Sequence, residues 1–142
     1  MRKSIATVVA TVSIFLFFGC DIESDENFQF VTLEVISADM PEVFTQNAIH
    51  QIEVTYRRAD DCTFFYDFDV SSNEANRRDI VAIGSYLTKD TCSETDDEVK
   101  AILRFQPLET FTYHFRFYTG SNENDEPQYV EYMVPVEPKE VN

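Results

Sequence analysis

The residues that could act as nucleophiles, acids or metal ligands are few in this chain and widely spaced. The 142 residues include three cysteines and two histidines, His50 and His114. Covalent catalysis by a Ser or Cys needs a neighbouring His that a third group orients, and the sequence contains no G-x-S-x-G motif. A structural zinc site needs Cys and His ligands at short spacing, which neither histidine has. The sequence therefore predicts no catalytic residues, no metal site and no cofactor.

Carboxylates and carboxamides are densest in the segment Asn122-Glu123-Asn124-Asp125-Glu126. Calcium prefers such oxygen ligands from loops, but the D-x-D-x-D-G pattern is absent. We predict a solvated hairpin tip and retain the segment as the candidate binding loop, because loops carry much of protein recognition. A calcium-binding domain, or a hydrolase with paired carboxylates, is the least favoured alternative.

The first twenty residues have the pattern of an export signal. Two basic residues precede an apolar run from Ile5 to Phe18, which is shorter than the ~20 residues of a membrane-spanning helix. The run ends in L-F-F-G-C at Cys20, which resembles a lipobox. Residues 1–19 are therefore predicted to be a lipoprotein signal peptide, and residues 20–27 a lipidated acidic tether. The alternative is a plain signal peptide in which Cys20 is incidental, but no A-x-A-like cleavage site is present.

If Cys20 carries lipid, the membrane is a partner through that lipid, and Cys62 and Cys92 remain as a pair. An even pair in an exported domain most often forms a disulfide. The bond would close a loop of roughly thirty residues and stabilise the fold by roughly 3–4 kcal/mol. A metal or redox pair would need close C-x-x-C spacing, so we favour a structural bridge over that alternative and over free thiols.

The chain is strongly acidic, with a formal net charge of −15. Residues 1–19 hold two of the eleven basic residues and none of the twenty-six acidic ones, so their removal brings the charge to about −17. A nucleic-acid partner is disfavoured, because phosphate backbones need neutralising Lys and Arg. A basic partner, divalent cations and simple solubility all remain compatible with this balance.

Apolar and polar residues alternate with a period of two at regular intervals, which is typical of short β-strands. The alternation predicts seven strands, near residues 28–37, 49–57, 62–70, 79–87, 99–106, 111–118 and 128–136. Such a series predicts an all-β, seven-stranded antiparallel immunoglobulin-like β-sandwich. We expect it to span residues 28–137, with a C-terminal tail of residues 138–142.

The same alternation assigns side chains to faces. In residues 111–118, the clearest strand, Phe115 and Phe117 are expected to face one way and His114 the other. In residues 62–70 the rule places Phe64, Tyr66 and Phe68 inward. Phe65, and Tyr118 in the later strand, then fall on the opposite faces, where exposed aromatic residues can mark a partner or sugar platform. Partial cover by loops is the favoured interpretation for both.

Several segments together resemble small uncharacterised lipoproteins of Bacteroidetes-type bacteria, which are single immunoglobulin-like domains behind a lipobox. They are residues 52–56, Cys62 before a Phe/Tyr-rich strand, Cys92, residues 111–117 and residues 129–132. The resemblance implies a lipid-anchored protein of the outer membrane, on its periplasmic face or at the cell surface. The acidic residues 21–26 resemble a surface-export signal, and a solvated tether is an equal alternative.

By fold-level analogy, which is its only basis, the leading expectation is a lipid-anchored, non-enzymatic binding or structural module of the cell envelope. We expect a monomer that presents loops to a protein or glycan partner. The alternative is an accessory subunit of an outer-membrane nutrient-uptake complex. A large exposed apolar patch on one sheet would favour the subunit, whereas polar outer faces would favour the free-standing module.

Overall fold

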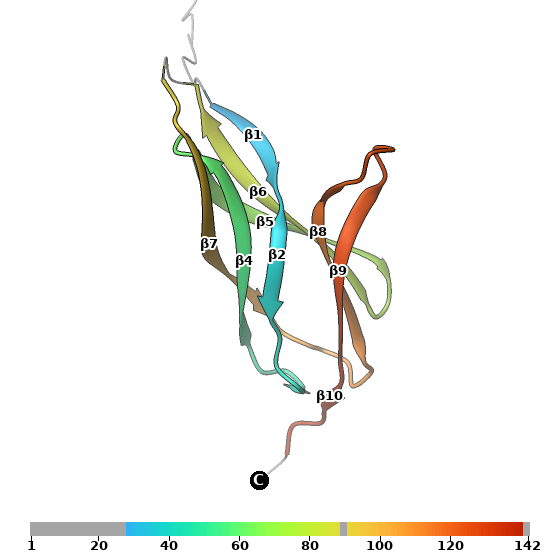
Figure 1. The fold of residues 1–142 in the computed structure, drawn as a ribbon. Coiled ribbons are helices and arrows are strands. Elements are labelled where there is room, and N and C mark those ends of the chain that lie inside the picture. Colours follow the sequence, from blue (N-terminus) through green and yellow to red (C-terminus); the bar gives the residue numbers. More distant parts are fainter. Residues whose placement is uncertain (1–27, 89–90, 141–142) are drawn as a thin grey trace, which may run out of the picture.

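β-Strands account for most of the chain in the computed structural model, which describes residues 28–88 and 91–140 (Figure 1). The ten strands are β1 (Phe28–Leu33), β2 (Val35–Asp39), β3 (Phe44–Thr45), β4 (His50–Asp60), β5 (Thr63–Glu74), β6 (Arg77–Leu87), β7 (Glu94–Phe105), β8 (Tyr113–Ser121), β9 (Pro127–Val134) and β10 (Val136–Glu137). No helix in the described ranges is long and apolar enough to cross a membrane. The predicted signal peptide, Cys20 and the tether of residues 20–27 lie outside those ranges.

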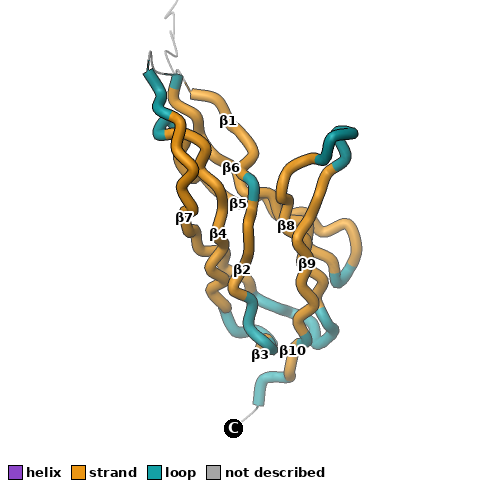
Figure 2. The backbone as a smooth tube through the Cα atoms, in the orientation of Figure 1, coloured by secondary structure: helices purple, strands orange, loops and turns teal. Residues whose placement is uncertain are grey.

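The strands form two main sheets and one short pair. In the five-stranded sheet, β5 takes one edge of β6, while β1 and β8 share the other edge and β9 follows β8. β1 pairs with residues 82–87 of β6, and β8 with residues 77–80. The three-stranded sheet has the order β2-β4-β7, and β3 pairs with β10. Figure 2 shows the loops gathered mainly at the two ends of the strands.

One hydrophobic core joins the two main sheets. Alternate positions of β4 and β8 contribute six of its side chains: Ile52, Val54, Tyr56, Tyr113, Phe115 and Phe117. The prediction for residues 111–118 is confirmed at these positions, since His114 and Arg116 are only half-buried on the opposite face. Two sheets that share one core are compatible with a β-sandwich.

The predicted count of seven strands is wrong. The expected strand at residues 28–37 is two strands, because the chain leaves the five-stranded sheet at Glu34 and continues in the other sheet. The two-residue strands β3 and β10 were also not anticipated, because two residues are too few to show an alternation. The other six predicted strands all exist, with ends shifted by up to five residues.

The expectation of wholly antiparallel sheets is also wrong. β6 and β8 are parallel neighbours, and so are β3 and β10. The first pairing arises because β7, which lies between β6 and β8 in the sequence, belongs to the three-stranded sheet. The chain therefore returns to the first sheet in the same direction, as parallel pairing requires.

The predicted faces of β5 are wrong for three of its four aromatic residues. The pairing of β5 with β6 shifts register between Phe65 and Asp67. A β-bulge of this kind adds one residue to one strand and reverses the alternation beyond it. Phe65 and Phe68 therefore pack against the core, while Phe64 and Tyr66 are exposed.

Candidate functional site

The outer face of the five-stranded sheet carries an exposed cluster of aromatic residues beside β1. A shallow hollow of about 440 Å³ opens there, which we call the aromatic groove. It is lined by Phe30 of β1, Ile83 of β6 and four consecutive residues of β5: Tyr66, Asp67, Phe68 and Asp69. The groove thus depends on the pairing of three strands.

Two aromatic rings form the accessible part of the aromatic groove. The ring centroids of Phe30 and Tyr66 are 4.8 Å apart, with the ring planes tilted by 58°. Phe30 is 57% exposed and Tyr66 62% exposed. Between them runs β6, where the small side chain of Ser85 lies opposite Phe30 in the register. Phe28 extends the row, with its ring 5.4 Å from that of Phe30.

Two carboxylates flank these rings. Asp67 Oδ1 accepts a hydrogen bond from the backbone N–H of Phe68 at 2.8 Å. Asp67 and Asp69 form no ion pair within residues 28–88 and 91–140. Arg104 lines a separate hollow together with Asp67 but makes no ion pair with it. The groove therefore combines exposed π-faces with negative charge and has no cation in its lining.

The remainder of the same sheet face is a network of paired charges centred on Asp79. Arg77 Nη2 donates to Asp79 Oδ2 at 2.8 Å, and Arg116 Nη1 donates to Asp79 Oδ1 at 3.3 Å. Arg116 Nε also lies 3.4 Å from Glu131, and its guanidinium covers the ring of Tyr129 at 4.0 Å. β6, β8 and β9 are thereby bound together across their outer face.

The Asp79 carboxylate is almost buried in this network, with 13% of its side chain exposed. Burial alone would raise its pKa. The hydrogen bonds from Arg77 and Asn73, together with the charges of Arg77 and Arg116, outweigh that effect, so the pKa of Asp79 lies below its ordinary value. The network therefore acts as a structural clamp in which the ionised form is favoured.

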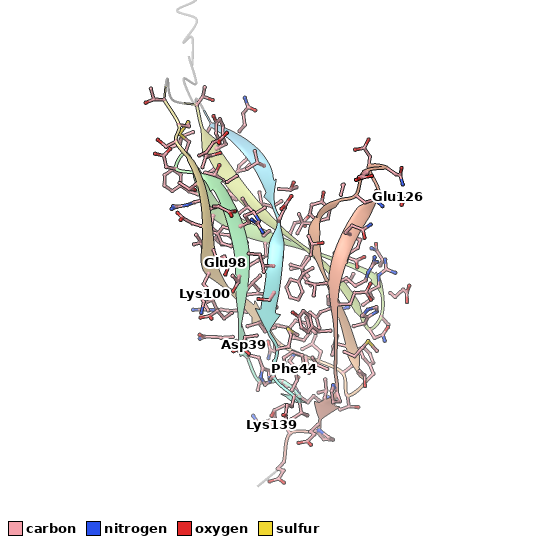
Figure 3. The ribbon with its side chains drawn as sticks, viewed as in Figure 1. Asp39, Phe44, Glu98, Lys100, Glu126 and Lys139 are labelled. Atoms are coloured by element: carbon pink, nitrogen blue, oxygen red, sulfur yellow. A yellow bond between two sulfur atoms is a disulfide. The ribbon has the colours of Figure 1, made fainter. Side chains whose placement is uncertain are left out.

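The outer face of the three-stranded sheet is also charged. Lys100 of β7 contacts Glu53 of β4 at 2.6 Å, and this carboxylate raises the pKa of the lysine. Arg57 pairs on this face with Asp96 of β7, whereas Arg58, the next residue, points to the opposite side of the sheet and pairs there with Asp97. Figure 3 shows Glu98 and Lys100 along the edge strand β7, away from the β8–β9 hairpin. This face presents a ladder of ion pairs and no groove of aromatic residues.

The predicted disulfide is present between Cys62 and Cys92. Asp61 lies beside it, and the three side chains bring potential metal-ligand atoms within 4.8 Å of one another. Both sulfurs are covalently bonded to each other, however, and metal binding by cysteine requires the thiolate. The cluster is therefore a structural crosslink in this oxidised state.

The predicted binding loop forms the tip of the β8–β9 hairpin, where Figure 3 labels Glu126. Asn122 Oδ1 accepts hydrogen bonds from the N–H groups of Asn124 and Glu126 at 2.9 and 3.0 Å. Asn122 Nδ2 donates to Glu126 Oε2 at 2.9 Å, and Asp125 has a φ of 60°. Asn122 and Glu126 are thus engaged within the turn, while the side chains of Glu123, Asn124 and Asp125 are exposed.

The two histidines have local structural contacts. The Thr45 N–H donates to His50 Nε2 at 3.0 Å, and the His50 ring packs against Phe44. His114 Nε2 lies 2.6 Å from Glu131 Oε2. Neither histidine is hydrogen-bonded to a Ser or Cys among the described residues.

A second hollow of about 380 Å³ lies where β1 passes into β2. Its polar groups include Glu34, Arg57, Asp60 and Thr63. Asp60 Oδ1 accepts hydrogen bonds from the Cys62 N–H at 2.9 Å and the Thr63 hydroxyl at 2.7 Å. Arg57 is paired with two carboxylates, those of Glu34 and Asp96. These groups are occupied by contacts within the chain, so the aromatic groove is the stronger candidate.

The aromatic groove was not anticipated from the sequence. The alternation rule placed Phe64 and Tyr66 in the core and selected Phe65 and Tyr118 as the exposed aromatic residues. One signal was available: three consecutive aromatic residues, 64–66, cannot all face one side of a regular strand. Tyr118 is half-buried and lies beside Tyr129, with ring centroids 6.1 Å apart.

No protein-family model, curated protein or solved structure matches the chain. The functional argument therefore rests on the geometry of these surfaces.

Proposed function

We propose that this protein is a lipid-anchored, non-enzymatic binding module of the bacterial cell envelope, with the aromatic groove as its binding surface. The observation that carries the proposal is the pair Phe30 and Tyr66, in contact with each other and more than half exposed. Burying a side chain of this size on a partner contributes about 1.5–3 kcal/mol. Exposed aromatic residues gathered in one place are typical of interaction sites.

The same geometry favours a limited contact over a permanent interface across the whole sheet. The groove takes up the β1–β5 side of the face, and the Asp79 network occupies the side formed by β8 and β9. A subunit that covered both would also have to desolvate the paired charges of Arg77, Arg116 and Glu131, and that penalty can exceed the attraction within the pairs. The accessory-subunit alternative is therefore less well supported.

The proposed location rests on the disulfide and on the N-terminal sequence. Disulfides persist mainly in oxidising compartments outside the cytoplasm. Only residues 21–27 separate Cys20 from Phe28, and a fully extended chain of this length spans at most about 28 Å. A lipid on Cys20 would hold the aromatic groove close to the outer membrane, on its periplasmic face or at the cell surface.

An immunoglobulin-like architecture is a further part of the proposal. It is supported by two sheets around one core and by a first strand divided between them as β1 and β2. The parallel neighbours β6 and β8 argue against it, because both sheets of that fold are antiparallel. Cross-strand NOEs between β5 and β8 would support the immunoglobulin-like order, and NOEs between β6 and β8 would exclude it.

Site-specific photo-cross-linking in intact cells tests the binding proposal. A photoreactive phenylalanine analogue at position 66 should give a discrete adduct with an envelope component. The same analogue at Glu98, an exposed position of β7, is the matched control and should give none. Equal adducts at both positions, or none at position 66, would contradict the proposal.

A further inference from the structure

We infer that the aromatic groove receives a cationic side chain, Lys or Arg, from a basic extended segment of a protein partner. This inference rests on the proposed binding function and specifies the chemistry of the partner. Three independent features of the molecule support it: the ring faces, the local carboxylates and the charge of the whole chain.

The first feature is the pair of accessible aromatic faces. The face of an aromatic ring carries partial negative charge and attracts cations within about 6 Å. Elsewhere in the described chain, Arg78 covers the ring of Tyr113 at 5.0 Å and Arg116 covers that of Tyr129 at 4.0 Å. No cation of the described residues lies over Phe30 or Tyr66. The groove thus offers a cation of a partner the same cation–π contact that the chain makes internally at Tyr113 and Tyr129.

The second feature is the pair of carboxylates at the rim. Asp67 and Asp69 have no ion-pair partner in the described ranges, in contrast to Asp79 with its two arginines. An ammonium or guanidinium group of a partner would therefore meet both a ring face and an unpaired carboxylate.

The third feature is the net charge of −15. A charge of this size steers cationic partners toward the molecule and repels anionic ones. A neutral glycan would stack on the aromatic rings. It would not be attracted by the negative field, however, and it would form no ion pair with the two carboxylates. The three features therefore favour a basic peptide over a glycan.

A peptide titration on the full chain tests this inference. The probe is a fluorescent Arg-Gly-Arg-Gly-Arg peptide, and its neutral twin carries citrulline in place of each arginine. We expect binding of the arginine peptide by fluorescence anisotropy at 150 mM salt, and at least tenfold weaker binding of the citrulline peptide. Amide shifts in NMR spectra should be largest at Phe30, Tyr66 and Asp69.

Paired variants separate groove binding from general attraction to an acidic protein. Tyr66→Ala should weaken binding about fivefold, whereas Met133→Ala, equally exposed at 61% on β9, should change it by less than about twofold. Asp69→Asn should weaken binding about threefold, and Glu123→Gln at the hairpin tip should have a smaller effect. Equal losses in target and control variants would overturn the inference, as would equal affinity for the citrulline peptide. Shifts centred on the groove with cellohexaose, but not with the arginine peptide, would assign a glycan instead.

A competition experiment distinguishes failure of this inference from failure of the proposed function. Excess arginine peptide should suppress the adduct formed from position 66. An adduct that persists would refute the cationic partner while the binding function stands. Absence of any adduct at position 66 would count against the binding function itself.

Discussion

Replacing both Cys62 and Cys92 with alanine should lower the free energy of unfolding by about 4 kcal/mol. The bond joins residues 30 positions apart, and the chain-entropy model assigns about 3.6 kcal/mol at 25 °C to a loop of that size. The loop that the disulfide closes contains β5 and β6. The connections at its two ends, β4–β5 and β6–β7, both cross between the two main sheets. The bond therefore restricts the unfolded chain across both crossings at once.

The native state adds a smaller contribution. Cys62 is fully buried, so loss of its sulfur removes apolar contacts worth about 0.8 kcal/mol, by comparison with one buried methylene. The hydroxyl of Tyr86 also loses its contact with Cys92 Sγ, 3.5 Å away. Both effects have the same sign as the loop-closure effect, so the total should be near 4 kcal/mol and lower the melting temperature by roughly 10–20 °C.

Urea unfolding at pH 7, followed by tyrosine fluorescence and far-UV circular dichroism, measures this difference. All chains should carry Cys20→Ala, which removes the third thiol without touching the bridge. The parent chain under reducing conditions should unfold close to the double variant, because both lack the crosslink. A difference below about 1 kcal/mol between oxidised parent and double variant would refute the reasoning.

Three further predictions concern other parts of the molecule. Asp79→Asn should lower the free energy of unfolding at neutral pH. Because the folded pKa of Asp79 is lowered, this loss should be constant above the ordinary pKa of 3.8 and should shrink as the pH falls through the folded pKa. A loss that is independent of pH in acid-range urea titrations would contradict the clamp. Gly84→Ala should cost about 1–3 kcal/mol in the same assay, because its new Cβ would lie 2.9 Å from Leu33 Cδ2; Ser85→Ala, the neighbouring control, should cost less than about 0.5 kcal/mol. Full-length protein should incorporate labelled palmitate and Cys20→Ala should not, as followed by gel autoradiography; equal labelling of both would contradict the lipid anchor.

Protease shaving of intact cells, with a periplasmic protein as leakage control, addresses the side of the membrane that the domain faces. Loss of the domain would support surface display and make the acidic residues 21–26 a credible export signal. Cleavage only after permeabilisation would support the periplasmic face.

Sequence reasoning was successful where the physical rule is local. Alternate side chains point to opposite faces of any regular strand, so Phe115 and Phe117 of β8 were correctly distinguished from His114. The disulfide followed from the cysteine count once Cys20 was assigned to the lipid, because only Cys62 and Cys92 then remain as candidates.

Tertiary structure decided everything that depends on which strand pairs with which. The alternation of residues 62–70 does not fix the position of the bulge in β5, because the bulge arises from the register with β6. This single inserted residue moved Tyr66 from the predicted core to the surface. Likewise, Asp79, Arg116 and Glu131 are separated by up to 52 positions in the sequence and meet only because β6, β8 and β9 are neighbours in one sheet. The amino-acid sequence alone determined the all-β class, the disulfide and the inward faces of the regular strands, because side-chain alternation and cysteine count are properties of the chain itself. The aromatic groove and the charged clamp were decided by strand pairing, because their parts come from different strands and have no fixed spacing along the chain.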